Sequence, residues 1–157
     1  MSGGNMQVRV FDLECIKTKN VKHGHQNGLF IPVWRDWDKI YEKEPKMVYV
    51  TTCFPGELKG PHLHHQRWSY LTVLKGKVAF IVKLGDEFKE FVITADKPQT
   101  IVIPAGIPQA HVNIGDEDAI VMNLCNPAWH PENQDNYTAD YGDYDFSKWG
   151  YRPTHAD

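Results

Sequence analysis

The stretch that decides the predicted fold is residues 60–76, GPHLHHQRWSYLTVLKG. Its first part predicts an extended segment, because Pro61 has no amide donor and residues two apart on a strand face the same side. His62 and His64 are therefore expected on one face of this strand and His65 on the other. Two imidazoles on one face, next to a second strand, make a small cluster of titratable nitrogens.

Further β-rich runs surround this stretch at close and regular spacing, with glycine and proline turn signals between them. Such spacing is typical of an all-β barrel or jelly roll. We predict one domain over residues 1–157, with a barrel core over about residues 47–126. The expected strands are 7–11, 47–54, the strand that carries His62 and His64 (the HxH strand), 69–74, 77–84, 88–94, 99–103 and 119–125.

Three segments outside the predicted barrel are harder to place. Residues 17–27 are polar and carry His23 and His25, and we expect a solvated loop there rather than a metal site. Residues 35–44 predict a short helix or loop with one buried face, formed by Trp37, Ile40 and Tyr41. The polar and aromatic tail that begins at Asn126 is expected to wrap over the barrel as loops and a turn of helix.

Composition excludes several classes of protein. The 157 residues are 41% hydrophobic, and no apolar run is as long as a membrane span. The first residues lack the pattern of a secretory signal, and the three cysteines, Cys15, Cys53 and Cys125, are too scattered for a disulfide framework. We therefore expect a cytoplasmic protein with no membrane partner. A net charge of -3, with cations spread along the chain, argues against nucleic acid and leaves a small anionic ligand open.

Residues 60–76 resemble the first signature of the cupin superfamily, which is a glycine, HxH, four residues, a glutamate, six residues and a glycine. Ser69 stands at the glutamate position, and Gly76 closes the motif. The segment IPAGIPQAHVN resembles the second signature, PxGxxH with a later Asn, in which Gln109 replaces the histidine and Asn113 matches the asparagine. The pairing of both signatures implies a cupin jelly roll that lacks two of the four family metal ligands.

Strand alternation predicts which side chains line the cupin pocket. Gln109, His111 and Asn113 are expected on one face of a strand, so His62, His64, Ser69, Gln109 and His111 can meet. Three imidazoles and an amide are compatible with a transition metal held by His62, His64 and His111. The other interpretation, which we favour, is a metal-free pocket where one neutral imidazole accepts a proton.

Within the cupins, the chain resembles the RmlC-like nucleotide-sugar 3,5-epimerases, the dTDP-4-dehydrorhamnose epimerases and their relatives. Their RGLHYQ signature aligns either with KGPH, residues 59–62, or with LHHQ, residues 63–66. The first alignment makes His62 the proton acceptor and Lys59 the phosphate-facing cation. The second makes His64 the acceptor, and we prefer it because Gln66 also matches.

The resemblance implies deprotonation of the carbon next to a 4-keto group and reprotonation on the opposite face. The family lysine falls at Ser69, its second-signature histidine at Gln109, and its tyrosine acid at Ala128 or Trp129. We therefore look for replacements. The candidate acids are Tyr137, Tyr141 and Tyr144, of which we select Tyr137; the candidate enolate donors are Arg67 and His111; the candidate stacking side chains are Trp68 and Trp129.

These inferences give a set of expected site residues and three hypotheses for function. The expected catalytic residues are His64, His62 and Tyr137, and the expected substrate contacts are Lys59, Gln66, Arg67, Trp68, Ser69, Gln109, His111, Asn113 and Trp129. The leading hypothesis is epimerisation or isomerisation of a nucleotide-linked 4-keto-deoxysugar for surface polysaccharide. The alternatives are a metal-dependent oxygenase or isomerase and a non-catalytic sugar-binding cupin. We expect a homodimer, because exposed sheet edges need to be covered.

Overall fold

The computed structural model describes residues 7–153, so the ends of the predicted domain, residues 1–6 and 154–157, lie outside the described part. Regular structure is almost entirely β, as predicted. The elements are β1 (Arg9–Asp12), β2 (Ile16–Lys19), β3 (Gln26–Phe30), β4 (Met47–Cys53), β5 (Leu58–Leu63), β6 (Trp68–Lys75), β7 (Lys77–Leu84), β8 (Glu87–Thr94), β9 (Gln99–Ile103), β10 (Gln109–Asn113), β11 (Ala119–Asn126), β12 (Tyr137–Thr138) and a 3-10 turn, η2 (Phe146–Trp149).

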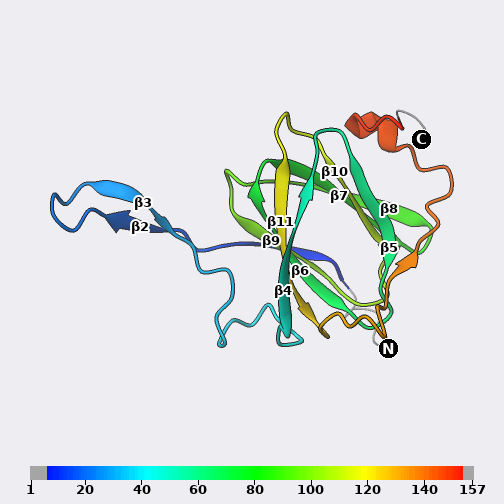
Figure 1. Ribbon diagram of the computed structural model, residues 1–157, viewed down its shortest axis with the longest axis horizontal. Helices are drawn as coiled ribbons and strands as arrows, with labels where there is room; N and C mark the ends of the chain where they lie inside the picture. The colour runs from blue at the N-terminus through cyan, green and yellow to red at the C-terminus, as the bar shows by residue number, and fades with distance from the viewer. Residues whose placement is uncertain (1–6, 154–157) are drawn as a thin grey trace.

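Two five-stranded antiparallel sheets form a jelly roll, with strand orders β1-β9-β6-β11-β4 and β12-β5-β10-β7-β8 (Figure 1). Their facing surfaces bury apolar side chains from both sheets, among them Val78, Phe80, Ile101, Ile103 and Val121. The alternation predicted for the strands at 77–84 and 99–103 therefore places these side chains in the core. The cupin architecture expected from the two signatures is confirmed.

The tail covers the outer face of one sheet. Short β12 pairs with β5, and the chain then crosses β7, where the Tyr141 hydroxyl donates a 2.7 Å hydrogen bond to the carbonyl of Ile81. Aromatic tail side chains pack on Ala79, Ile81, Ala110 and Val112, which explains why β7 is buried on both faces. The predicted wrapping tail with one helical turn is confirmed. No helix among residues 7–153 is long and apolar enough to cross a membrane.

Two predictions for the N-terminal part are confirmed only in part. The turn at residues 21–25, which carries His23 and His25, is exposed as predicted, but the residues on either side of it pair as a hairpin, β2–β3, which projects from the barrel in Figure 1. Segment 35–44 adopts the loop alternative, with turns and no helix. The expected buried face is wrong for Trp37, whose side chain is 65% exposed, with the Arg35 guanidinium 4.0 Å from its ring centroid. Only Tyr41 of the expected buried face packs firmly, against Tyr70.

Candidate active site

A local irregularity in β5 positions the first pocket side chains. Gly60 has φ +90, and a Cβ there would lie 2.9 Å from the Gln109 carbonyl oxygen, so only glycine fits this close approach. The register between β5 and β10 shifts at this point, with Gln109 opposite His62 and His111 opposite Lys59. Lys59 and His62, three residues apart, therefore both face the inside of the barrel.

The inner pocket is a cavity of about 80 Å³ between the two sheets. Strands β5 and β10 bring in four of the residues expected from the sequence, and β4 of the opposite sheet adds a phenol and a hydroxyl. A fifth expected residue, His64, follows directly after β5. The lining residues are Tyr49, Thr51, Lys59, His62, His64, Leu71, Gln109, Ala110 and His111.

His64 is held in one tautomer. Its Nδ1 lies 2.6 Å from the carbonyl oxygen of Asp135, and because a carbonyl can only accept, Nδ1 carries the proton. The other nitrogen, Nε2, then has a free lone pair. Burial lowers the pKa of His64; the Asp135 hydrogen bond opposes this effect, and Arg67 and His62 add to it. His64 is thus a neutral imidazole with an available acceptor nitrogen, as a general base requires.

Asp135 also fixes the loop that carries His64. Its carboxylate accepts hydrogen bonds from the backbone amides of His65, Gln66 and Arg67 at 2.8, 2.9 and 3.1 Å. Desolvation raises the pKa of this carboxyl, but the three amide bonds outweigh that effect and the net pKa is lowered. Asp135 adopts φ 49, a left-handed conformation that Asp tolerates better than most residues.

His111 contributes a buried polar nitrogen with no partner. Among the described residues, its Nε2 is the one buried side-chain nitrogen or oxygen that lacks a hydrogen bond. Burial, followed by the charges of Lys59 and His62, lowers the pKa of His111 to about 4. At neutral pH this side chain is uncharged, so it can offer the pocket a hydrogen-bonding group but no positive charge.

The pocket favours negative charge on its ligand. Among residues 7–153, its lining includes the Lys59 ammonium and no carboxylate. Arg67, only 7% exposed, contributes a second cation nearby, and its guanidinium reaches the Gln134 carbonyl at 3.5 Å. Burial lowers the pKa of His62, with further lowering by Lys59 and Arg67. An oxyanion that develops in this pocket would meet positive charge and neutral imidazoles.

Tyr49 is a pocket residue that the sequence reasoning missed. The Asn123 amide donates to the Tyr49 hydroxyl oxygen at 2.9 Å and to the Ser69 hydroxyl at 3.3 Å, which leaves the Tyr49 proton free to be donated. Ser69, expected as a substrate contact, lies buried behind this amide. The signal was present, since alternation in MVYVTTC places Tyr49 on the same face as Thr51 and Cys53.

Other expected site residues lie outside the inner pocket. The Asn113 amide donates to the carbonyls of Cys53 and Glu117 and accepts from the Gly115 amide. Asn113 therefore stabilises the turns next to the ends of β4 and β10. Tyr137 is 51% exposed, and its ring lies against His65 on the outer side of β5. The Trp68 ring stacks near Tyr70, and Trp129 is exposed. Gln66 and Arg67 line a separate cleft of about 370 Å³.

The described residues do not gather metal ligands into one group. No group of three or more His, Cys, Asp or Glu side chains among residues 7–153 is arranged to hold a metal ion. The rings of His62 and His64 are 6.1 Å apart between centroids, and Ser69 and Gln109 occupy the positions where the cupin signatures carry a glutamate and a histidine. The neutral imidazoles of this pocket suit hydrogen bonding and proton transfer.

This combination of a jelly roll, an HxH strand and a carboxylate-free pocket defines the class: an RmlC-like cupin with the fold of nucleotide-sugar epimerases and isomerases. The family model described as FdtA: WxcM-like, C-terminal, matches residues 4–149. The chain belongs to this family.

Three known proteins show the range of its relatives. A probable low-salt glycan biosynthesis epimerase, Agl13 of Haloferax volcanii, is 28% identical over 125 residues, 74% of this chain and 80% of Agl13. A UDP-2-acetamido-2,6-beta-L-arabino-hexul-4-ose reductase of Pseudomonas aeruginosa is 29% identical over 94 residues, 59% of this chain and only 25% of the reductase. The dTDP sugar isomerase of Desulfovibrio desulfuricans G20 shares the fold, with a TM-score of 0.72 at 15% identity over 96% of this chain and 92% of the isomerase.

Proposed function

We propose that this protein epimerises or isomerises a nucleoside-diphosphate 4-ketosugar by moving a proton on a carbon next to the ketone. The observation that carries the proposal is the orientation of His64, whose Nδ1 is bound to the Asp135 carbonyl while Nε2 remains free as a base. The family match and the epimerase and isomerase relatives support the same chemistry. The likeness to Agl13, a probable glycan biosynthesis epimerase, also supports a role in making glycans.

The reaction starts when His64 Nε2 takes the proton from the carbon beside the ketone. The electron pair of the broken C–H bond forms an enolate, whose oxygen carries the negative charge. Lys59 and neutral His111 line the same pocket and can stabilise this charge. The enolate then recovers a proton on carbon, and the ketone re-forms.

The position of the returning proton decides the product. Tyr49 lies on β4, in the sheet opposite to the one that contains β5, the strand before His64. Its hydroxyl proton is free. Return from Tyr49 on the opposite face of the sugar inverts the carbon, which is epimerisation. If His64 instead returns the proton to the former carbonyl carbon, and the hydroxyl proton of the first carbon moves to the enolate oxygen, the ketone shifts by one carbon, which is isomerisation. Tyr49 in the pocket is the observation that favours epimerisation.

Solvent exchange tests the proposal directly. The purified protein is incubated in D₂O with a set of nucleoside-diphosphate 4-keto-6-deoxysugars, and deuterium at the carbons next to the ketone is followed by NMR and mass spectrometry. We expect exchange that His64→Asn abolishes and His65→Ala, on the outer side of the strand, retains. Absence of exchange with every such sugar, by protein that binds them, would favour a non-catalytic sugar-binding cupin.

We also infer that the reaction needs no metal. The support is the donor set: among residues 7–153, no three His, Cys, Asp or Glu side chains form a group that could hold a metal ion, and the pocket lining includes no carboxylate. Elemental analysis of protein purified without chelators should find substoichiometric metal, and chelator treatment should leave solvent exchange unchanged. One first-row metal per chain, lost in His64→Ala, would instead support the metal-dependent alternative.

We propose a cytoplasmic homodimer. The hairpin β2–β3 exposes Ile16, Leu29 and Phe30, and the edge strand β4 exposes Val48 and Val50 on its outer face. Apolar side chains on an edge strand and an arm are a common basis for pairing between chains. Light scattering should give twice the 18.1 kDa chain mass, and Phe30→Asp with Leu29→Asp should lower it. A single-chain mass at micromolar concentration would contradict the dimer.

A further inference from the structure

A buried asparagine lies directly behind the Tyr49 hydroxyl. Asn123 is 2% exposed and lies on β11, the strand between β4 and β6. In the register of these strands it is opposite Tyr49 on one side and Leu71 on the other, so the three side chains share the inner face of the sheet. Tyr49 and Leu71 line the inner pocket, and Asn123 is not one of its lining residues. An effect of Asn123 on the reaction therefore has to pass through its neighbours.

The orientation of the Asn123 amide follows from its hydrogen bonds. The backbone amide of Tyr70, which can only donate, donates to Asn123 Oδ1 at 2.9 Å. The amide nitrogen Nδ2 then faces the other way, and it lies 2.9 Å from the Tyr49 hydroxyl oxygen and 3.3 Å from the Ser69 hydroxyl oxygen. Because Nδ2 can only donate, both hydroxyls accept from it. The two N–H groups and the carbonyl oxygen of this amide each have a partner.

This hydrogen bond decides where the Tyr49 proton points. A phenol that accepts a hydrogen bond keeps its own proton for a different partner. Within residues 7–153 no acceptor for that proton is found, and Tyr49 lines the inner pocket. The Asn123 amide thus presents the Tyr49 hydroxyl to the pocket as a donor.

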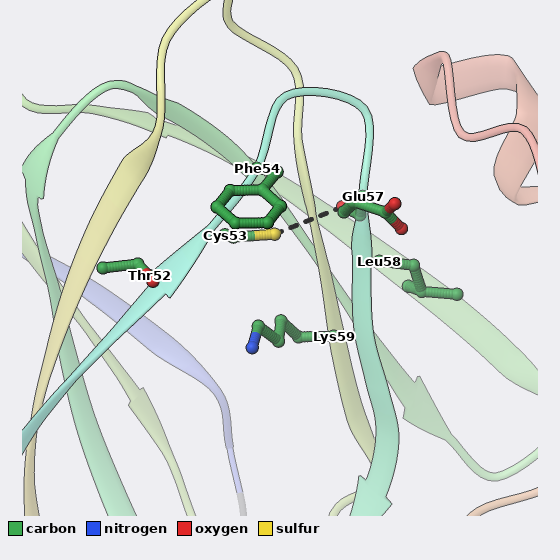
Figure 2. A pocket seen from close by; sticks show the side chains of 6 residues that line it. All are labelled: Thr52, Cys53, Phe54, Glu57, Leu58 and Lys59. Atoms are coloured by element: carbon green, nitrogen blue, oxygen red, sulfur yellow. Dashed lines mark hydrogen bonds between the residues drawn. The ribbon is translucent and has the colours of Figure 1, made fainter.

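The backbone that carries Tyr49 is held by other contacts. β4 pairs with β11 from Met47 to Cys53, and at its end the Cys53 thiol donates to the Glu57 carbonyl at 3.3 Å, across the turn to β5 (Figure 2). The Asn123 side chain is therefore not required to place the Tyr49 ring. What it sets is the direction of one hydroxyl proton.

An amide at this position of the core costs stability. Val121 and Cys125, on the same face of β11, are 1% and 0% exposed, and Val121 belongs to the apolar core. Leucine has nearly the same shape as asparagine and would bury apolar surface there, whereas a buried amide loses its water and regains only its protein hydrogen bonds. Local rules of core composition are broken mainly at functional sites. Asn123 is such a departure, next to the pocket.

We propose that Asn123 is a positioning residue that makes Tyr49 the acid of the epimerisation. The inference rests on the proposed function and names the residue that directs its second proton transfer. The enolate carbon takes the Tyr49 proton into a new C–H bond, and the electron pair of the O–H bond stays on the phenolate oxygen. The Asn123 N–H then donates to a charged acceptor, which strengthens that hydrogen bond. The proton removed first remains on His64, and exchange with water returns both residues to their starting states.

Asn123→Asp reverses the polarity of this contact at almost constant volume. The new carboxylate can only accept, so it takes the hydroxyl protons of Tyr49 and Ser69 and keeps the Tyr70 amide as its donor. With the Tyr49 proton turned away from the pocket, we expect inversion to slow by about 10²-fold or more. Deuterium exchange at the same carbon through His64 should be retained. Asn123→Leu, which removes the amide, should slow inversion by about 10-fold, the effect of one neutral hydrogen bond.

Thr72→Val is the matched control. Thr72 is 2% exposed, and its hydroxyl is hydrogen-bonded to that of Thr100 at 2.8 Å. It follows Leu71 on β6 and so points away from the pocket. This variant loses a buried hydrogen bond of the same sheet, as Asn123→Leu does, and should keep the wild-type ratio of inversion to exchange.

Both rates are measured in D₂O with the 4-keto-6-deoxysugars that wild type exchanges, by NMR and mass spectrometry, and folding is followed by circular dichroism. Raman difference spectra against Tyr49→Phe report, without substrate, whether the Tyr49 hydroxyl accepts or donates a hydrogen bond. We expect an acceptor in wild type and a donor in Asn123→Asp. Identical Tyr49 signals in the two proteins would overturn the orientation.

An unchanged ratio of inversion to exchange in folded Asn123→Asp would overturn the proposal and leave the proposed function intact. If that variant does not fold, the same ratio in Asn123→Leu decides. Wild type that exchanges without inverting would also refute the acid role and leave only isomerisation. If wild type exchanges none of these sugars, the proposed function fails, and the role of Asn123 fails with it.

Discussion

The Nδ1 atom of His64 lies 2.6 Å from the carbonyl oxygen of Asp135, a residue 71 positions further along the chain. This contact links the HxH strand to the tail and fixes which imidazole nitrogen is free. The Asp135 carboxylate at the same time holds three amides of the loop after His64. Several expected outcomes follow from this arrangement and from its neighbours.

Removal of the His64 imidazole should abolish proton transfer without unfolding the protein. General-base catalysis contributes about 10²- to 10⁴-fold to rate, so His64→Asn should lose solvent exchange by at least two orders of magnitude. Exchange is measured by NMR, and folding by circular dichroism. His65→Ala, which removes a ring packed outside the pocket against Tyr137, is the control. Equal rates in the two variants would remove His64 from the mechanism.

Substitution of Asp135 separates its side-chain role from its conformation. Asp135→Ala loses three hydrogen bonds to backbone amides and places Ala in a left-handed conformation, so both thermal stability and exchange rate should fall. Asp135→Asn retains a carbonyl acceptor and tolerates φ 49, so it should be milder in both measurements. If both variants keep the wild-type stability and exchange rate, the carboxylate is not what positions His64.

Two tyrosines compete for the role of acid, and phenylalanine substitutions distinguish them. Of the residues that the structure describes, Tyr49 is the one tyrosine in the inner pocket lining, and we expect Tyr49→Phe to slow inversion at carbon by about 10²-fold or more. Tyr137→Phe alters an exposed ring beside His65 and should retain the wild-type rate. The opposite ranking would reinstate the acid selected from the sequence, and would require the tail to move into the pocket.

Acid should destabilise the fold through its buried imidazoles. The pKa of His111 is about 4 in the folded state and about 6.5 when unfolded, so the unfolded chain takes up a proton that the folded protein does not. Stability is therefore full above about pH 6.5 and falls as pH drops toward 4, by up to about 3 kcal/mol from this group. Urea unfolding at pH 7 and pH 4.5 measures it.

His111→Gln is the comparison for that experiment, because glutamine cannot titrate. Its loss of stability between pH 7 and pH 4.5 should be smaller than that of wild type, though not zero, since the pKa values of His62 and His64 are also lowered by burial. The lowered pKa of His64 should also keep this base neutral below pH 6.5. The fall of kcat/KM on the acid side should therefore lie below that pH. If the free energy of unfolding depends on pH identically in His111→Gln and in wild type, His111 is not a buried neutral imidazole.

Asn113 should prove important for stability rather than for substrate binding. Its buried amide donates to the carbonyls of Cys53 and Glu117 and accepts from the Gly115 amide. Asn113→Ala leaves these groups without partners and should lower the free energy of unfolding by about 2 to 4 kcal/mol. KM measured below the melting temperature should change little. A large rise in KM with unchanged stability would return Asn113 to the substrate contacts.

Much of the fold was predictable because alternation along a strand is local. Side chains two apart share a face, so 77–84 and 99–103 could be assigned to the core, and the HxH and IPAGIPQAH segments to one pocket, before any contact was known. The hairpin β2–β3 was missed because its strands are exposed on both faces, which leaves no alternation of apolar and polar residues in the sequence.

The amino-acid sequence by itself therefore determined three features. They are the jelly roll, the HxH strand, and the pocket in which His62, His64, Gln109 and His111 meet. Only tertiary structure decided that Tyr49, from the opposite sheet, enters the pocket, that Tyr137 stays outside it, and that a distant carbonyl selects the tautomer of His64. The reason is physical. Side-chain alternation is set by backbone geometry between neighbouring residues, whereas these three outcomes depend on packing between segments far apart in the chain.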